Sequence, residues 1–262
     1  MRYAAMDQSL GRGTGPATAI FPAAREAELD GVELCLGSGY VDDPLWSLPS
    51  ARTTATAARD SGLDLPSFAL LMLNAGGFSG DARTRERARD IVRHAIAVAH
   101  ELAARLILLP FFGAGTIEGT VAIDQVTADL RSLAPVAEQA GVRLGIETTL
   151  RAPTVVGILR LVDSRAVTAY FDIANAVWLG YDPVAELETL SAADALPQIH
   201  VKDIQDRPGD RPLGQGRVSY PAVATALRRL GYDGYLVFET TPTAQPATAA
   251  RHNVVLMERY LE

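Results

Sequence analysis

Short apolar runs alternate along the chain with longer stretches in which apolar residues recur every three or four positions. The short runs are nearly continuous in Val, Ile, Leu and Phe, which is the pattern of parallel strands buried on both faces. We expect such strands at eight places: Arg2–Met6, Gly31–Leu36, Leu65–Leu73, Arg105–Pro110, Val142–Glu147, Val167–Asp172, Pro197–Lys202 and Gly234–Thr240.

Helical periodicity fills much of the sequence between these runs, with apolar residues spaced to cover one helix face. Gly141 and Gly231 follow two of these stretches, where a helix end favours left-handed backbone. Pro183 and Pro221 suit the first turn of a helix, where a missing N–H costs nothing. The expected helices are Thr84–Ala104, Ala122–Ala140, Pro183–Leu190, Tyr220–Leu230 and Ala247–Leu261.

Eight strands alternating with helices over 262 residues predict an α/β fold, a (β/α)8 TIM barrel. An open, doubly wound sheet would alternate too, but eight regular units at this length favour the barrel. No linker-like or low-complexity tract interrupts the chain, so we expect a single domain over residues 1–262. The first 60 residues are the least regular part of the pattern.

Charge and cysteine content narrow the classes of function. With 24 Lys and Arg against 31 Asp and Glu, the net charge is −7, which argues against nucleic acid as a partner. Cys35 is the only cysteine, which excludes an internal disulfide and any multi-cysteine metal site. The N-terminal segment does not have the pattern of a signal peptide, and no apolar run approaches the roughly 20 residues that span a bilayer. We expect a cytoplasmic protein with no membrane partner.

Four consecutive expected strands carry a polar residue at or beside the carboxyl end: Glu147, Asp172, His200 and Glu239. Function gathers at these ends in barrel enzymes. Three carboxylates at one rim repel one another unless a cation lies between them. A carboxylate there is commonly only a helix N-cap, but four polar residues in succession favour a divalent metal ion. Mixed carboxylate and imidazole ligands suit Mn²⁺, Mg²⁺, Co²⁺ or Zn²⁺, and the oxygen majority favours the harder ions.

Five motifs occur in order along the chain and include these residues: Gly145-Ile-Glu147-Thr-Thr-Leu150, Tyr170-Phe-Asp172-Ile-Ala-Asn175-Ala176, Ile199-His200-Val-Lys202-Asp203, Leu213-Gly214-Gln-Gly216 and Gly231-Tyr-Asp-Gly-Tyr-Leu-Val-Phe-Glu239. Together they resemble the sugar phosphate isomerase/epimerase family of xylose isomerase-like TIM barrels. The resemblance is strong from about residue 84 onward and diffuse before it. It implies that Glu147, Asp172, His200 and Glu239 bind one metal ion, with Mn²⁺ favoured, and that Glu147 and Glu239 are the catalytic acid/base pair.

Asn175 distinguishes between branches of that family. Ketose 3-epimerases of free sugars usually have histidine three residues after the strand-6 aspartate, which is Asp172 here. Asparagine at this position resembles the pentulose-5-phosphate 3-epimerase branch, although Ala174 replaces that branch's usual glycine. Asn175 either hydrogen-bonds the substrate or holds Asp172 in place.

The predicted function is a metal-dependent epimerase or aldose–ketose isomerase of sugars or sugar phosphates in carbohydrate metabolism. A metal ion bound to the carbonyl and hydroxyl oxygens of a ketose stabilises the enediolate formed by proton loss. Two glutamates act as acid and base, returning the proton to the far face in an epimerase or to the neighbouring carbon in an isomerase.

Residues just past the strand that contains His200 are candidates for substrate binding. Lys202 and Arg207 supply cations for a phosphate or for sugar hydroxyls. Lys202 has an alternative role in an ion pair with Asp203 or another rim carboxylate, and Arg207 an alternative as a solvated side chain. Glu33 either faces the site or is buried for structural reasons. Because relatives often form dimers, the resemblance also points to a homodimer.

Other functions remain open for this fold. The same enolate chemistry would serve a lyase of the inosose or dehydroshikimate dehydratase type. An apurinic endonuclease shares the barrel but resembles a histidine-rich trinuclear zinc site, and this chain has four histidines with only His200 at a strand end. A non-catalytic binding protein would have no need of both Glu147 and Glu239.

Overall fold

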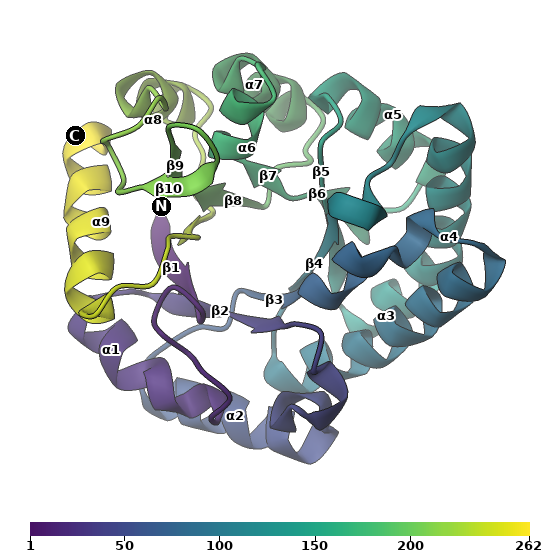
Figure 1. Ribbon diagram of the computed structural model, residues 1–262, viewed down its shortest axis with the longest axis horizontal. Helices are drawn as coiled ribbons and strands as arrows, with labels where there is room; N and C mark the ends of the chain where they lie inside the picture. Colours follow the sequence, from purple (N-terminus) through teal and green to yellow (C-terminus); the bar gives the residue numbers. More distant parts are fainter. The chain divides into compact units, whose positions relative to one another are not determined.

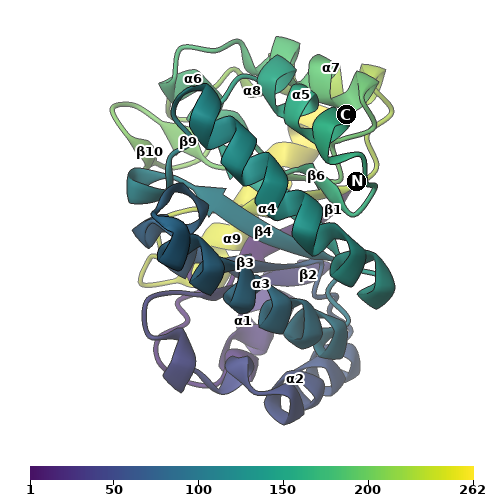
Figure 2. The same ribbon diagram turned by 90° about the vertical axis from the view of Figure 1, so that its right-hand side faces the viewer.

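The computed structural model describes all 262 residues, and its helices and strands are labelled in Figures 1 and 2. The chain divides into two compact units. The first unit comprises residues 1–34, 57–66 and 170–262, and the second comprises residues 35–56 and 67–169.

The first unit contains a parallel sheet in the order β2-β1-β11-β8-β7. Its register aligns the carboxyl ends of neighbouring strands, because Asp172 pairs with His200 and Phe238 pairs with Val201. Polar residues at these ends are therefore brought to one edge. The strands of this unit are β1 (Arg2–Met6), β2 (Gly31–Leu36, to residue 34), β7 (Phe171–Asp172), β8 (Gln198–Val201) and β11 (Tyr235–Phe238), with a separate antiparallel hairpin of β9 (Asp203–Ile204) and β10 (Pro208–Arg211).

Proline begins most of the helices of the first unit. Pro183, Pro221 and Pro246 lie in the first turn of α7, α8 and α9, where the missing N–H leaves no bond unmade. The helical elements are η1 (Ala17–Ile20), α1 (Phe21–Glu26), α6 (Ile173–Trp178), α7 (Pro183–Ala192), α8 (Tyr220–Arg229) and α9 (Pro246–Leu261).

The second unit contains a parallel sheet in the order β3-β4-β5-β6. The long helices α3 and α4 each bury one apolar face and end in left-handed backbone, α4 at Gly141 as expected. The strands are β3 (Ser67–Leu70), β4 (Leu106–Phe111), β5 (Arg143–Thr148) and β6 (Val167–Ala169). The helical elements are η2 (Tyr40–Asp42), η3 (Pro44–Trp46), α2 (Leu48–Asp60, to residue 56), η4 (Leu71–Ala75), η5 (Gly77–Ser79), α3 (Ala82–Leu102), η6 (Gly113–Gly115), α4 (Gly119–Ala140) and α5 (Ala152–Val162).

Seven of the eight expected strands have the ends that the sequence predicted, to within about two residues. The run Leu65–Leu73 is shorter than expected, because β3 stops at Leu70 and the chain coils into η4 ahead of Gly76 and Gly77, both with positive φ. The run 167–172 is interrupted at Tyr170, which separates β6 from β7.

All five expected helices are confirmed, but others were missed. Helix α2 buries Ala51, Ala55 and Ala58, small residues that carry a weak apolar signal in the sequence. Helix α5 is rich in β-branched residues, which favour strands by propensity. None of the helices is both long and apolar enough to cross a membrane.

Candidate metal centre

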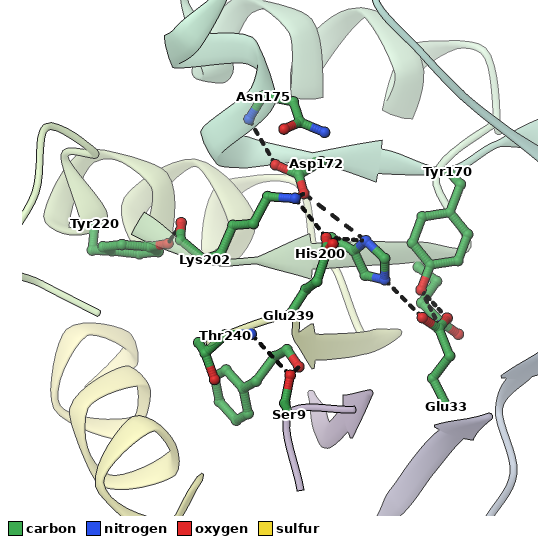
Figure 3. Close-up of polar contacts among 12 residues, drawn as sticks. Ser9, Glu33, Tyr170, Asp172, Asn175, His200, Lys202, Tyr220, Glu239 and Thr240 are labelled. Atoms are coloured by element: carbon green, nitrogen blue, oxygen red, sulfur yellow. Dashed lines mark hydrogen bonds and ion pairs between the residues drawn. The ribbon is translucent and has the colours of Figure 1, made fainter. Parts of the chain in front are cut away.

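Three side chains converge at the carboxyl ends of β7, β8 and β11 in the first unit: Asp172, His200 and Glu239 (Figure 3). His200 Nδ1 lies 3.0 Å from Glu239 Oε2 and 3.9 Å from Asp172 Oδ2. Asp172 and His200 are almost completely buried, whereas the Glu239 side chain is 32% exposed. The cluster is thus reachable from solvent on the Glu239 side.

Asp172 uses its two carboxylate oxygens for different purposes. Oδ1 accepts the backbone N–H of Asn175 at 2.7 Å and so caps helix α6. Oδ2 lies 2.9 Å from Nζ of Lys202. Asp172 therefore caps a helix, which is one of the alternatives for a strand-end carboxylate, and keeps its second oxygen within the cluster.

Ser9 holds the backbone on both sides of Glu239. Its hydroxyl donates to the carbonyl of Phe238 at 3.2 Å and accepts the N–H of Thr240 at 3.0 Å. Glu239 itself donates its backbone N–H to the carbonyl of Val201 at 3.1 Å, which extends the β11–β8 pairing by one residue. These bonds determine the direction in which the Glu239 carboxylate leaves the strand.

Glu33 on β2 orients the His200 ring from its other side. His200 Nε2 lies 2.9 Å from Glu33 Oε1, so the carboxylate favours a proton on Nε2 and directs Nδ1 toward Asp172 and Glu239. Tyr170 donates to Glu33 Oε2 at 2.6 Å, and Gln198 Nε2 lies 3.3 Å from the same oxygen. A carboxylate bonded to the outer nitrogen of a histidine is the usual support of a metal-binding imidazole.

Lys202 is the only lysine of the chain, in which every other cationic side chain is an arginine. Its Nζ donates to Glu239 Oε2 at 2.6 Å and pairs with Asp172 Oδ2, and the residue is 7% exposed. Of the two roles considered for Lys202, the ion pair with rim carboxylates is present, with these partners rather than Asp203. An ammonium is compact enough to enter a space where a planar guanidinium would not fit.

Electrostatic surroundings move the pKa values of the two carboxylates in opposite directions. Burial raises the pKa of Asp172, against the opposing effect of the Lys202 ammonium. Burial would also raise the pKa of Glu239, but Lys202 and His200 outweigh it and hold this pKa well below its usual range. Glu239 is therefore ionised throughout the physiological pH range.

The donor set of this cluster fits a divalent ion. Asp172, His200 and Glu239 each offer a ligand atom, and these atoms lie within 4.8 Å of one another. Ligands at right angles around an ion with bonds of about 2.1 Å are separated by about 3 Å, close to the shorter of the distances from His200 Nδ1. Two carboxylate oxygens and one supported imidazole suit Mn²⁺, Mg²⁺, Co²⁺ or Zn²⁺.

Glu147, the fourth expected ligand, belongs to the second unit. It lies one residue before the end of β5, pairs in register with Pro110 of β4, and is 5% exposed. The carboxyl end of β5 therefore carries a buried carboxylate, as the sequence predicted.

The two remaining expected site residues, Asn175 and Arg207, differ in burial. Asn175 is buried in α6, and its backbone N–H holds Asp172. Arg207 is exposed in the β9–β10 hairpin, five residues beyond Lys202.

Sequence reasoning missed the supporting residues Tyr170 and Gln198 and left Glu33 undecided. Gln198 and His200 are two apart on β8 and so share a face, which was a usable signal. Glu33 was also detectable, as the only charge within the apolar strand β2. Tyr170 carried no such signal.

The chain is similar in sequence to a known family and to two curated proteins. A family model described as the xylose isomerase-like TIM barrel matches residues 21–260. An Escherichia coli K12 protein with the provisional name L-ribulose-5-phosphate 3-epimerase is 29% identical over 211 residues, which cover 74% of this chain and 72% of that protein. The 2-epi-5-epi-valiolone 7-phosphate 2-epimerase of an Actinoplanes strain is 28% identical over 204 residues, which cover 76% and 73%.

Solved structures show the same likeness in fold. The D-psicose 3-epimerase of Clostridium cellulolyticum H10, determined with D-tagatose, has a TM-score of 0.83 over the whole of both chains at 16% identity. The family match and this superposition agree with the strand and helix order described above. The chain belongs to the family of xylose isomerase-like TIM barrels.

Proposed function

We propose that this protein is a divalent-metal-dependent epimerase or isomerase of a sugar or sugar phosphate. The observation that carries the proposal is the cluster of Asp172, His200 and Glu239, in which Glu33 supports the imidazole from behind. The names of the two sequence relatives, both phosphosugar or cyclitol-phosphate epimerases, support the same reaction class. Mn²⁺ is the ion we favour, because oxygen ligands outnumber nitrogen.

We infer that Glu147 completes the ligand set. In a (β/α)8 barrel the carboxyl ends of all strands meet at one rim, so a carboxylate at the end of β5 belongs to the same rim as Asp172 and His200. This inference treats residues 1–262 as one barrel domain, with the two compact units as its parts. Glu147 is buried, and an ionised carboxylate in that setting needs a cationic partner.

The proposed chemistry is proton transfer next to a carbonyl. When bound, the metal ion supplies a Lewis acid that polarises the carbonyl and makes the neighbouring C–H more acidic. Glu239 is ionised at neutral pH and can therefore accept a proton. Glu147 serves as the second acid/base group on the other face of the planar enediolate. Return of the proton to that face inverts the carbon, and return to the adjacent carbon isomerises the sugar.

Three further residues are proposed to bind the substrate. Lys202 contacts both Asp172 and Glu239, so its ammonium lies where a substrate oxygen would meet these carboxylates. Asn175 follows Asp172 by one helical turn, and Arg207 extends from the hairpin that follows β8. A small-molecule sugar is the expected partner, and the assembly we expect is a homodimer.

One experiment tests the reaction class. The purified protein is freed of metal, reloaded with Mn²⁺, and incubated in deuterated water with a panel of ketoses and ketose phosphates. We expect metal-dependent deuterium incorporation next to the carbonyl, together with an epimeric or isomeric product, detected by NMR. Loss of water from the substrate would indicate a lyase instead. The proposal fails if no panel member exchanges a proton with any of the four candidate ions.

A further inference from the structure

A cavity of about 600 Å³ lies between the hairpin and the start of α9, entirely within the first unit. Its walls come from residues 207–213 of the hairpin and the segment after it, residues 240–245 after β11, and the first turns of α9. One wall begins at Thr240, the residue that follows Glu239 in the chain. We refer to this space as the hairpin cavity. Neither the expected metal ligands nor Lys202 line it.

Two arginines give the hairpin cavity a positive wall. Arg207 and Arg211 line it, both are exposed, and no acidic side chain forms an ion pair with either. Asp210 is the only carboxylate among the lining residues, and it is bonded to the hairpin backbone, accepting the N–H groups of Gln205 and Asp206 at 2.7 and 3.0 Å. These bonds, and to a smaller degree Arg211, lower the pKa of Asp210. Both guanidinium groups are thus left for a ligand.

Hydroxyl groups line the opposite wall. Thr240, Thr241, Thr243 and Thr248 all border the cavity. Thr241 donates to the carbonyl of Gly209 at 2.7 Å, which ties the segment after β11 to the hairpin. Helix α9 begins at this wall without a side-chain cap, so its first turn adds a favourable field for a negative charge. Arginine forks with hydroxyl donors are the usual recognition chemistry of a phosphate group.

The base of the hairpin is held rigidly. The Asp203 carboxylate is fully buried and accepts the N–H groups of Gly214 and Gly216, each at 2.9 Å, and that of Val218 at 3.2 Å. A side chain at Gly216 would overlap Asp203 and the carbonyl of Ile204. The two arginines therefore extend from a fixed base, which reduces the ordering cost of binding an anion.

We propose that the hairpin cavity binds the phosphate group of the substrate, so that the enzyme acts on a phosphorylated ketose rather than on the free sugar. This inference rests on the proposed function. The cavity is built from the loops after the last two barrel strands, where phosphate sites recur in TIM barrels. Thr240 borders the cavity and directly follows Glu239 in the chain, so the phosphate would be held beside the segment that carries the proposed acid/base group.

Binding of inorganic phosphate to the intact protein, measured by titration calorimetry at constant ionic strength, tests the site without any turnover. The variants are Arg207→Gln and Arg211→Gln, singly and together, which keep a long polar side chain and remove the charge. Arg259→Gln, at an exposed position in the last turn of α9, removes the same charge outside the cavity. We expect phosphate affinity to fall about tenfold for each cavity arginine and to be unchanged in the Arg259 variant.

The kinetic arm compares the same variants on matched free and phosphorylated ketoses with Mn²⁺ bound. We expect the cavity variants to raise KM for the phosphorylated ketose about tenfold each, and to raise KM for the free ketose by a clearly smaller factor, because only the phosphorylated ketose loses a charged contact. The inference is overturned if phosphate binding does not depend on Arg207 and Arg211, or if wild-type kcat/KM is equal for the free and phosphorylated forms. Arginine-dependent phosphate binding without turnover of any ketose would instead leave the site standing and refute the proposed function.

Discussion

The strand ends of the two units differ sharply in chemistry. In the first unit, β7, β8 and β11 lead into Asp172, His200 and Glu239, and β2 contributes Glu33. In the second unit, β3 leads into the uncharged segment Leu71–Ala75, β4 ends on Phe111, and β5 alone carries a carboxylate, Glu147. The strands of both units are parallel and buried, so the difference lies in the few residues at the carboxyl end of each strand.

The two units therefore contribute different numbers of charged groups to the proposed site. Charged groups in the first unit lie in contact with polar partners, because Lys202 contacts two carboxylates and Glu33 contacts the His200 ring. Such a network can exist in a buried place only when each charge has a partner. The second unit carries one carboxylate at a strand end, Glu147, and the other residues at its strand ends are uncharged, so the proposed acid/base pair takes one glutamate from each unit.

The largest effect is expected when either proposed acid/base residue, Glu147 of the second unit or Glu239 of the first, is replaced by glutamine. For Glu147→Gln and Glu239→Gln in metal-loaded protein, we expect turnover to fall about 10²- to 10⁴-fold, because the proton acceptor is lost while the volume is kept. The surviving glutamate can still exchange substrate protons with deuterated water from its own face. Metal occupancy is measured alongside, and Glu188→Gln on the surface of α7 is the control. Full activity in either metal-replete variant would refute the paired-base mechanism.

Lys202→Met distinguishes the stabilising effect of the Lys202 ammonium from that of a bound metal ion. In metal-free protein at neutral pH we expect the free energy of unfolding to fall by about 3 kcal/mol, because Asp172 and Glu239 lose their shared cation. Mn²⁺ should restore most of this loss, which thermal unfolding with and without the ion would detect. Arg259→Met is the matched control. Equal destabilisation of Lys202→Met with and without Mn²⁺ would mean that no ion shares these carboxylates.

Glu33→Gln removes the carboxylate behind His200 and leaves the expected ligands in place. We expect Mn²⁺ affinity to fall about 10- to 100-fold, because the imidazole loses the partner that directs Nδ1 toward the cluster. Equilibrium titration with Mn²⁺ followed by electron paramagnetic resonance measures this. Unchanged affinity would reduce Glu33 to a buried structural residue, the alternative that the sequence left open.

Tyr170→Phe is the smallest change to the same support. It removes the hydroxyl that donates to Glu33 and accepts from Gln198 Nε2, with an expected loss of about 1–2 kcal/mol in the free energy of unfolding. The expected change in Mn²⁺ affinity is smaller than for Glu33→Gln. If Tyr170→Phe weakened Mn²⁺ binding more than Glu33→Gln, the order of support from Tyr170 through Glu33 to His200 would be wrong.

The sequence predicted secondary structure best where a single strong feature, such as an apolar run or a helix-ending glycine, determines the local structure. Apolar runs located the eight strands, and the glycine at position 141 marked the end of α4. It was least informative where small or β-branched residues form helices, as in α2 and α5, because tertiary packing overrides weak propensity there.

The candidate site shows the same limit. Asp172, His200 and Glu239 were visible as strand-end residues, but the bond from Tyr170 to Glu33 joins positions 137 residues apart and has no local signature. His200 also lies deeper than its position near a strand end indicates, because it is 1% exposed and its ring packs against the Tyr170 ring, with 4.5 Å between the ring centroids. Its truncation to alanine would therefore cost stability as well as a ligand.

Anomalous diffraction from crystals grown with Mn²⁺ would test the proposed four-residue metal site, because it locates the ion and its ligands together. We expect one manganese peak within about 2.0–2.4 Å of His200 Nδ1 and of one oxygen each from Glu147, Asp172 and Glu239. Manganese bound by residues of the first unit alone, with Glu147 turned away, or no manganese among these side chains, would contradict it.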